Sequence, residues 1–218
     1  DCLKFLGIPV DGTKEEMVRQ LQHKGYTLQN FEDIEFLEGE FNGHNVHIYI
    51  NTNKGNVDRI YVAFQNMQNE AGIITQFNNL QYDFNKSDKY SIDLYHINEY
   101  IPTNEDISYE MAVHNKKYVA IFHQKFTENE LSILKETIQE NYDGIEANLK
   151  ENRSELTDLI INNDTLTIEQ KAEYLAKGYN ITNAMKNEVW FTIEEYKGKY
   201  YIALFYDNLY NRPNGEDL

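Results

Sequence analysis

The feature that most constrains this chain is a set of short segments in which every second residue is apolar. Val46, Ile48 and Ile50 alternate with more polar neighbours, and the dipeptide Asn42-Gly43 stands just before them. A period of two predicts a β-strand with one buried face, and Asn-Gly between two such segments is the strongest short signal of a hairpin. The same reasoning predicts strands at residues 35–42, 60–64, 90–94, 107–113, 118–122, 189–193 and 202–206. The pattern therefore favours a largely antiparallel sheet.

Two segments with helical spacing divide these strands into two groups. Met17 and Leu21 share one face of a helix predicted over Thr13–Lys24, and Gly25 is placed to end that helix in the left-handed conformation. A second helix is predicted over residues 69–82, where apolar residues recur at the same spacing. Each helix is followed by strands, so the chain uses one plan twice.

The predicted fold is α+β in two layers, built from tandem units in which a helix precedes an antiparallel meander. The first unit spans residues 1–66, and the second combines residues 67–126 with 188–211. Both belong to a single domain of 218 residues. The apolar opening stretch Leu3–Thr13 is expected to dock into the core, with a turn at Asp11-Gly12 and a helix cap at Thr13.

Residues 127–187 interrupt the second unit and are predicted to form a helical insertion in the same domain. Thr127 and Glu130 fit a capping box, and a further helix is predicted over Thr167–Lys177, ending at Gly178. The first insertion helix carries apolar residues at close to heptad spacing: Leu131, Leu134, Ile138, Tyr142, Ile145 and Leu149. Such a face can pack against a core, a partner or a second copy of itself, so the oligomeric state stays open.

The charge of the chain limits its partners. The formal net charge is −16, which repels phosphate backbones and anionic membrane surfaces, so neither nucleic acid nor membrane binding is expected. A basic protein partner or a divalent cation would be attracted, although acidity also serves solubility alone. No apolar run is long enough for a transmembrane segment. The single cysteine, Cys2, excludes an intrachain disulfide, and the start at Asp1 rather than Met indicates that a leader was removed.

Several segments resemble a known family. They are Leu3-Lys4-Phe5-Leu6-Gly7-Ile8-Pro9-Val10-Asp11-Gly12-Thr13, Leu21, Lys24-Gly25-Tyr26, Gly39-Glu40-Phe41-Asn42-Gly43 and Tyr206-Asp207-Asn208. Together they look like an uncharacterised family of small exported proteins of anaerobic gut bacteria, over roughly residues 3–126 and 189–211. The resemblance implies export to the periplasm or cell surface after signal-peptide removal, and it transfers no functional residue. By analogy of fold alone, the plan is similar to the helix-plus-meander repeats of β-lactamase inhibitor proteins and small outer-membrane assembly lipoproteins.

No motif for catalysis or cofactor binding appears. The chain has no glycine-rich phosphate loop, no nucleophile elbow and no complete calcium loop. His44 and His47 are the closest pair of histidines, but three residues apart on a strand they point to opposite faces, which suits a shared metal badly. Adjacent carboxylates such as Glu194-Glu195 are expected in so acidic a chain and are interpreted as a solvated face. We therefore predict a non-enzymatic protein without a cofactor or metal.

Aromatic residues and the insertion supply the candidate partner-binding residues. They are Tyr49, Tyr61, Tyr95, Leu131, Leu134, Ile138 and Ile145. Tyrosines in a row on a sheet would offer a protein or glycan surface at low entropic cost, or else the same rings would line the core. The sequence thus predicts an exported binding or scaffold protein of the bacterial envelope. A glycan-acting hydrolase and an envelope-assembly accessory are the alternatives.

Overall fold

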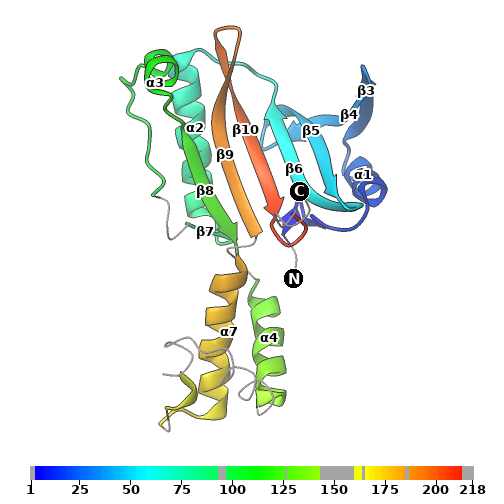
Figure 1. Ribbon diagram of the computed structural model, residues 1–218, viewed down its shortest axis with the longest axis vertical. Helices are drawn as coiled ribbons and strands as arrows, with labels where there is room; N and C mark the ends of the chain where they lie inside the picture. The colour runs from blue at the N-terminus through cyan, green and yellow to red at the C-terminus, as the bar shows by residue number, and fades with distance from the viewer. Residues whose placement is uncertain are drawn as a thin grey trace. The chain divides into compact units, whose positions relative to one another are not determined.

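The computed structural model describes residues 3–92, 97–125, 127–142, 160–163, 165–184 and 187–212. Its centre is an antiparallel eight-stranded sheet with the strand order β3-β4-β5-β6-β10-β9-β8-β7 (Figure 1). The strands are β3 (Thr27–Phe31), β4 (Ile34–Phe41), β5 (His44–Asn53), β6 (Asn56–Phe64), β7 (Tyr90–Ile92), β8 (Val119–Gln124), β9 (Asn187–Tyr196) and β10 (Lys199–Asn208). Strands β3–β6 form one meander and β7–β10 a second, and the two meet where β6 pairs with β10. The predicted tandem plan on a shared sheet is confirmed.

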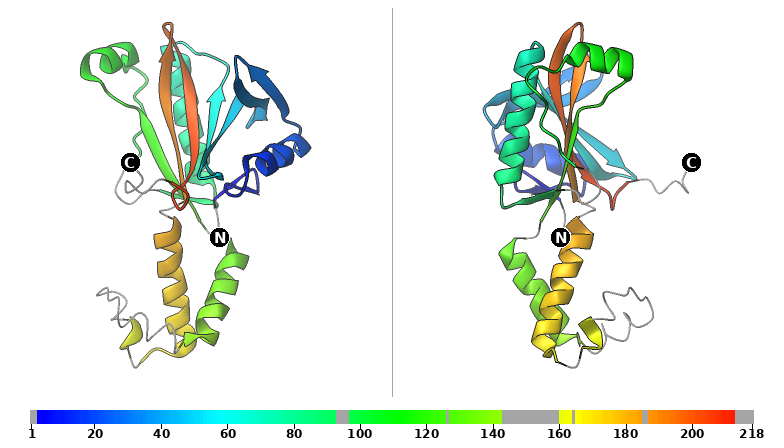
Figure 2. Two further views of the ribbon diagram at one scale, coloured as in Figure 1. Left: turned by 45° about the vertical axis from the view of Figure 1, so that its right-hand side comes forward. Right: turned by 90° about the vertical axis from the view of Figure 1, so that its left-hand side faces the viewer.

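One helix precedes each meander, and both lie on the same face of the sheet (Figures 1 and 2). Helix α1 (Lys14–His23) begins where the Thr13 hydroxyl accepts a hydrogen bond from the Glu16 amide, and it buries Met17 and Leu21. Helix α2 (Glu70–Lys86) has a longer buried face, which includes Phe77 and Phe84. The sheet and these helices are the two predicted layers.

The opening stretch docks into the core as predicted. It forms a small hairpin of β1 (Lys4–Phe5) and β2 (Ile8–Pro9), and Leu3, Phe5, Ile8 and Val10 are buried in the main core. Asp11 accepts a hydrogen bond from the Gly12 amide through Oδ1, at 2.8 Å. This hairpin therefore extends the core below the first meander without joining its sheet.

The hairpin turns explain why consecutive strands pair in register. Both residues of Asn42-Gly43, of Lys54-Gly55 and of Lys197-Gly198 have positive φ. Two consecutive left-handed residues twist a two-residue turn in the sense of the strands that it joins. The Asn42-Gly43 prediction is thus confirmed, and the same geometry fixes the β5–β6 and β9–β10 pairs.

One predicted element is wrong, and one strand of the sheet was not predicted. The predicted strand at 107–113 is wrong, because residues Ile107–His114 form helix α3, with Asp106 Oδ1 accepting from the Tyr109 amide and Asn115 in the left-handed conformation at the other end. Alternate apolar positions also contain an i, i+4 pair, so Ile107 and Met111 can share one helix face. Strand β3 was not predicted, since its side chains are mostly exposed and show no alternation.

The end of the last strand is tied to the first meander. The Asn211 side-chain amide donates to Asp11 Oδ1 and to the Val57 carbonyl, each at 2.8 Å. Its own carbonyl accepts from the Asn53 side chain at 2.7 Å. Asn211 therefore ties the end of the last strand to the first meander, and residues 213–218 lie outside the described part.

Residues 125–185 form a compact unit separate from the unit that contains the sheet. Helices α4 (Glu128–Glu140) and α7 (Ile168–Ala184) pack together there around Ile138, Ala172 and Ala176. The predicted helix end at Lys177-Gly178 is wrong, because α7 continues through Gly178 to Ala184. A single helical glycine costs only about 1 kcal/mol relative to alanine, which neighbouring turns can offset. Among the described helices, none combines the length and apolarity needed to cross a membrane.

Candidate functional site on the open face of the sheet

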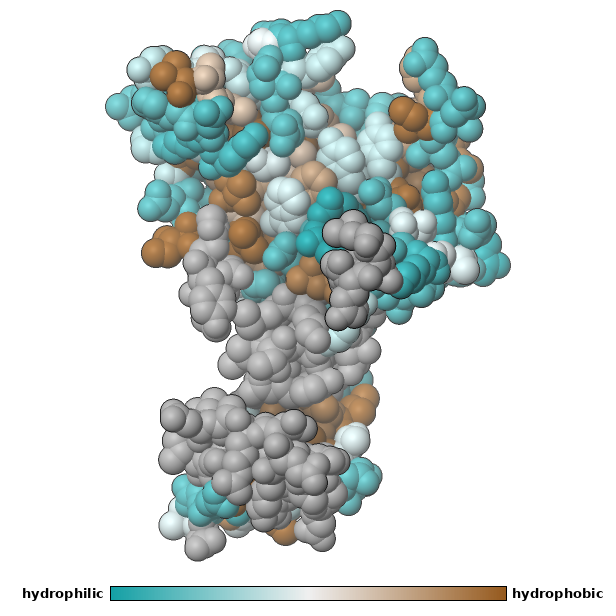
Figure 3. Space-filling view, in the orientation of Figure 1, coloured by the Kyte–Doolittle hydropathy of each residue, from teal (hydrophilic) through white to brown (hydrophobic). Residues whose placement is uncertain are grey.

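The side of the sheet opposite α1 and α2, called here the outer face, carries the side chains that alternate with the buried core. On β6, Ile60 and Val62 are buried on the helix side while Arg59 and Tyr61 are half-exposed on the outer face. Figure 3 looks onto this side and shows pale and brown side chains among teal ones across the sheet. The pleat alone therefore selects which residues a partner can reach.

Five aromatic rings form a continuous row across the outer face, one from each of five neighbouring strands. They are Phe36, Tyr49, Tyr61, Phe205 and Trp190, in spatial order. Their successive centroid distances are 5.7, 5.3, 4.9 and 4.1 Å. Tyr61 is paired with Tyr49 on one side and with Phe205 on the other, and Phe205 is paired with Trp190, so strand register brings the rings together. The row crosses from the first meander into the second.

The rings from Tyr49 to Trp190 are stacked on one another, whereas Phe36 is tilted by 36° to Tyr49. The ring planes are tilted by only 10° between Tyr61 and Phe205 and by 15° between Phe205 and Trp190. At these short distances such small angles place the rings face to face. The faces of Tyr61 and Phe205 are therefore largely occupied by neighbouring rings. A rigid ridge of ring edges results, because each ring restricts the rotation of the next.

A charged cluster fixes one side of the row. Asp207 has no exposed side-chain surface, and its carboxylate accepts from Arg59 Nε at 2.5 Å and Arg59 Nη2 at 2.9 Å. Trp190 Nε1 donates to the same carboxylate at 2.7 Å, and Arg212 also donates to it. The Arg59 guanidinium lies 5.1 Å from the Phe205 ring centroid. The hydrogen bonds to Asp207 raise the pKa of Arg59, so this cation stays charged and is committed to Asp207.

The Tyr49 and Tyr61 hydroxyls stay protonated at neutral pH. Burial raises the pKa of Tyr61 far above its ordinary value, and the neighbouring Tyr201 hydroxyl adds to the increase. The pKa of Tyr49 is also raised, first by burial and then by Tyr201. These hydroxyls are consequently hydrogen-bond donors and acceptors, not charges.

The surroundings of the row are acidic. Glu38 on β4 and Glu194 on β9 lie on the outer face, and Glu188 stands opposite Asp207 on the neighbouring strand. His47 lies against Phe36, with ring centroids 4.4 Å apart. Burial lowers the pKa of His47, and the Glu38 charge opposes that shift. The row is therefore an aromatic centre with carboxylates around it.

The predicted partner-binding residues are divided among three places. Tyr49 and Tyr61 lie in the aromatic row. Leu131, Leu134 and Ile138 lie on α4, where Ile138 is buried and Leu134 packs against it. Tyr95 and Ile145 lie outside the described residues. Sequence reasoning missed Phe36, Phe205, Trp190 and Arg59, although the alternation of each strand would have placed them opposite the core.

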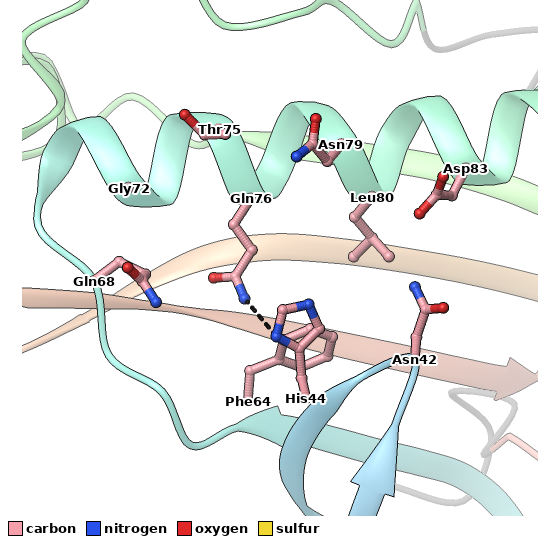
Figure 4. Close-up of a pocket in the computed structure, with 10 residues that line it drawn as sticks. All are labelled: Asn42, His44, Phe64, Gln68, Gly72, Thr75, Gln76, Asn79, Leu80 and Asp83. Carbon is pink, nitrogen blue, oxygen red and sulfur yellow. Dashed lines mark hydrogen bonds between the residues drawn. The ribbon is translucent and has the colours of Figure 1, made fainter.

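A separate groove lies on the helix side, between α2 and the β4–β5 turn. It encloses about 390 Å³ and is lined by Asn42, His44, Phe64, Gln68, Gly72, Thr75, Gln76, Asn79, Leu80 and Asp83. Figure 4 shows Gln76 reaching from the helix toward His44, with Nε2 3.4 Å from His44 Nδ1. His44 and His47 thus point to opposite faces, as the sequence predicts. The described residues contain no cluster of three or more possible metal ligands.

Comparisons with protein-family models, with curated proteins and with solved structures found no match to this chain. The class of the protein is therefore defined by its architecture: an α+β protein with two helix-plus-meander units on one antiparallel sheet. The resemblance of its opening segment to exported proteins stays a prediction.

Proposed function

We propose that this protein is a non-catalytic binding protein that recognises a basic protein partner through the outer face of its sheet. The observation that carries the proposal is the aromatic row, which spans five strands and both meanders. Aromatic residues dominate the energetic centres of protein interfaces, because they bury much area while fixing few rotatable bonds.

The geometry of the row favours a protein over a sugar at this face. A sugar ring stacks on an exposed aromatic face, but here the faces of Tyr61 and Phe205 are turned toward each other. Ring edges and neutral hydroxyls suit the mixed apolar and polar surface of a folded protein. Because the rings already restrain one another, binding would cost little additional side-chain entropy.

The charges favour a basic partner. The chain has a net charge of −16, and Glu38 and Glu194 lie on the outer face near the row. Arg59, which lies beside the row, is already paired with Asp207. Complementary charge at the edge of an interface speeds association and selects against acidic surfaces.

The helical unit supports the proposal less well. Ile138 is buried against α7, and Leu134 packs against the same small core. These residues, which the heptad-like spacing suggested for a partner, are occupied within the unit itself. Ile133 and Tyr174 remain exposed on its helices, so a role for this unit is tested directly below.

The alternatives have weaker support. Paired carboxylates are needed for glycan hydrolysis, and one carboxylate, Asp83, is found among the residues that line the groove. Export rests on the resemblance of several segments to exported proteins, and a role in envelope assembly rests on analogy of fold alone. Fractionation of cells that express the complete gene product would test them, and recovery in the cytoplasm alone would exclude both.

Capture of native partners by outer-face variants would test the proposal. The wild-type chain and a Tyr61→Ser/Phe205→Ser variant would be immobilised and exposed to envelope and extracellular fractions, with bound proteins identified by mass spectrometry. A basic protein retained by the wild type should be lost by the variant, and its retention should weaken as salt increases. Tyr82→Ser is the matched control, because Tyr82 is exposed on α2, on the helix side.

A second variant separates the two units. Replacing residues 125–186 with a short turn removes the helical unit, and the captured partner should still bind. If capture persists in the outer-face variant but disappears with the helical unit, the proposed surface is wrong.

A further inference from the structure

The groove beside α2 has the composition of a ligand site, and it is independent of the outer face. Four residues with side-chain amides line it, namely Asn42, Gln68, Gln76 and Asn79, together with Thr75, whose hydroxyl donates to the Ala71 carbonyl. Each amide both donates and accepts hydrogen bonds. A ligand whose groups also do both, such as a polyhydroxylated molecule, would match this lining.

One of these amides lacks a partner. The Gln76 Oε1 atom is buried from solvent and accepts no hydrogen bond, while its Nε2 contacts His44 Nδ1. Figure 4 shows this oxygen turned toward the side of the groove where the Gln68 amide lies. Turning the amide over would exchange the roles of oxygen and nitrogen but still leave one of them without a partner. A buried polar atom without a partner is costly, so a small shift of the Gln76 side chain that lets a ligand donor reach this oxygen would relieve that cost.

The charged residues that line the groove disfavour an anionic ligand. No lysine or arginine lines it, and its one carboxylate is Asp83, at the far end from Gln68 (Figure 4). The groove lies beside the first turn of α2, but the Gly72 amide there already donates to the Asn69 side chain. A phosphate or carboxylate ligand would also need a cation to compensate its charge. Neutral hydroxyl groups need no cation, and a carboxylate such as Asp83 can accept from them.

The remaining walls are apolar. The Phe64 ring lies against His44, with centroids 5.0 Å apart, and Leu80 lies beside them on α2. A pyranose ring has carbon-bound hydrogens on its faces and hydroxyls around its rim, so it presents both kinds of surface. The volume of about 390 Å³ is at the lower end of the ~300–1,000 Å³ found for small-molecule sites.

We propose that this groove binds one or two units of a neutral, hydroxyl-rich sugar. Gln76 and His44 provide the central hydrogen bonds, the other amides contact the hydroxyl rim, and Phe64 and Leu80 form the floor. The site does not depend on the protein partner proposed above, since the two surfaces lie on opposite faces of the sheet.

Nuclear magnetic resonance on the whole chain would test this site. Neutral sugars (glucose, galactose, mannose, N-acetylglucosamine, lactose and maltose) would be titrated into ¹⁵N-labelled protein, with glucuronic acid and glucose 6-phosphate as charged comparators. For a ligand of this size we expect a dissociation constant of about 1 mM. At least one neutral sugar should shift the side-chain amide signals of Gln76 and Gln68.

Two substitutions should weaken that binding without unfolding the protein. Gln76→Leu removes the amide but keeps most of its volume, and His44→Phe keeps the contact with Phe64 but removes both ring nitrogens. Each should weaken binding about tenfold, since each removes hydrogen bonds to the sugar. Gln20→Leu is the matched control, because Gln20 is a half-buried glutamine on α1, outside the groove.

Three results would overturn the proposal. The first is the absence of amide shifts at sugar concentrations well above the expected dissociation constant. The second is unchanged sugar binding by both Gln76→Leu and His44→Phe, and the third is tighter binding of the charged comparators than of every neutral sugar.

Discussion

Both halves of the sheet are antiparallel meanders of four strands, but they differ in how their strands are joined. In the first half, β3–β6, two-residue turns with positive φ make all three connections: Glu32-Asp33, Asn42-Gly43 and Lys54-Gly55. In the second half, β7–β10, the turn Lys197-Gly198 does so once. Along the chain, helix α3 connects β7 to β8, and the helical unit connects β8 to β9.

The comparison shows that pairing in this sheet does not depend on short connections. Strands β8 and β9 remain in register from Val119 opposite Thr192 to His123 opposite Glu188, although the whole helical unit lies between them. Their buried faces, which include Phe122 and Phe191, supply the reason. A one-residue slip would turn these rings away from the core, so burial specifies register where the turn cannot.

The largest effect on stability is expected where the two halves of the sheet meet, at the β6–β10 pair. Replacing Asp207→Asn would put an amide NH₂ group among the donors of Arg59 and Trp190 and remove the charge that compensates the guanidinium. We expect a loss of about 3 kcal/mol in the free energy of unfolding, measured by urea denaturation.

Glu194→Gln is the control for this substitution, since Glu194 is a carboxylate on the same face that does not contact Arg59. It should change stability by less than about 0.5 kcal/mol. Equal losses of stability from both substitutions would show that the change in net charge, and not the loss of the Asp207 interactions, is responsible.

The next effect should be confined to the first half. A Cβ atom at Gly39 would lie 2.5 Å from Cδ1 of the Tyr26 ring, and the Tyr26 hydroxyl is held by the Glu40 carbonyl at 2.7 Å. Gly39→Ala should therefore cost about 2 kcal/mol through overpacking. No strand of the second half contains glycine, so it has no equivalent of this contact.

A double-mutant cycle identifies the cause. In a Tyr26→Ala background the ring is absent, and Gly39→Ala should then cost less than about 0.5 kcal/mol. If the cost is the same in both backgrounds, the tight contact with Tyr26 is not its origin.

Shortening the connection between β8 and β9 would make the second half of the sheet resemble the first. Because His123 pairs with Glu188, Gln124 and Asn187 would flank a two-residue turn if residues 125–186 were replaced with Asn-Gly. We expect the free energy of unfolding of the sheet unit to change by no more than about 1 kcal/mol, since closure entropy varies slowly with loop length. Loss of cooperative urea unfolding in this variant would contradict the prediction.

The sequence predicted the sheet and the order of its elements because burial of alternate residues leaves a strong pattern. It failed where a local interaction decided between two patterns. Residues 107–113 alternate like a strand, yet the Asp106 cap makes them a helix. Strand β3 leaves almost no pattern, because it lies at the sheet edge with its side chains exposed.

The candidate site was predicted only in part for a similar reason. Tyr49 and Tyr61 could be selected as tyrosines on strands. Their stacking with Phe205 and Trp190 depends on the β6–β10 and β9–β10 registers. Those registers join residues far apart in the chain, and alternation within one strand does not show which strands become neighbours. The groove likewise depends on where α2 crosses the sheet.

The smallest expected effect concerns the outer face of the first half. Burial lowers the pKa of His47 below its ordinary value of 6.5, and the charge of Glu38 holds it up. Between the two values the unfolded chain binds more protons than the native one, so stability rises with pH. The contribution is complete above about pH 6.5 and is lost as pH falls through the lowered pKa.

Urea denaturation at pH 7 and pH 5 should show this dependence. His47→Phe keeps a ring against Phe36 and should reduce the difference between the two pH values by no more than about 0.5 kcal/mol, because the imidazole is partly open to solvent and screened. The Glu38→Gln substitution gives the sharper measurement. It removes the opposing charge, so nuclear magnetic resonance titration should find a still lower pKa for His47. A higher pKa would mean that Glu38 does not act on His47 through its charge, and that the acidic surroundings of the aromatic row are weaker than their positions indicate.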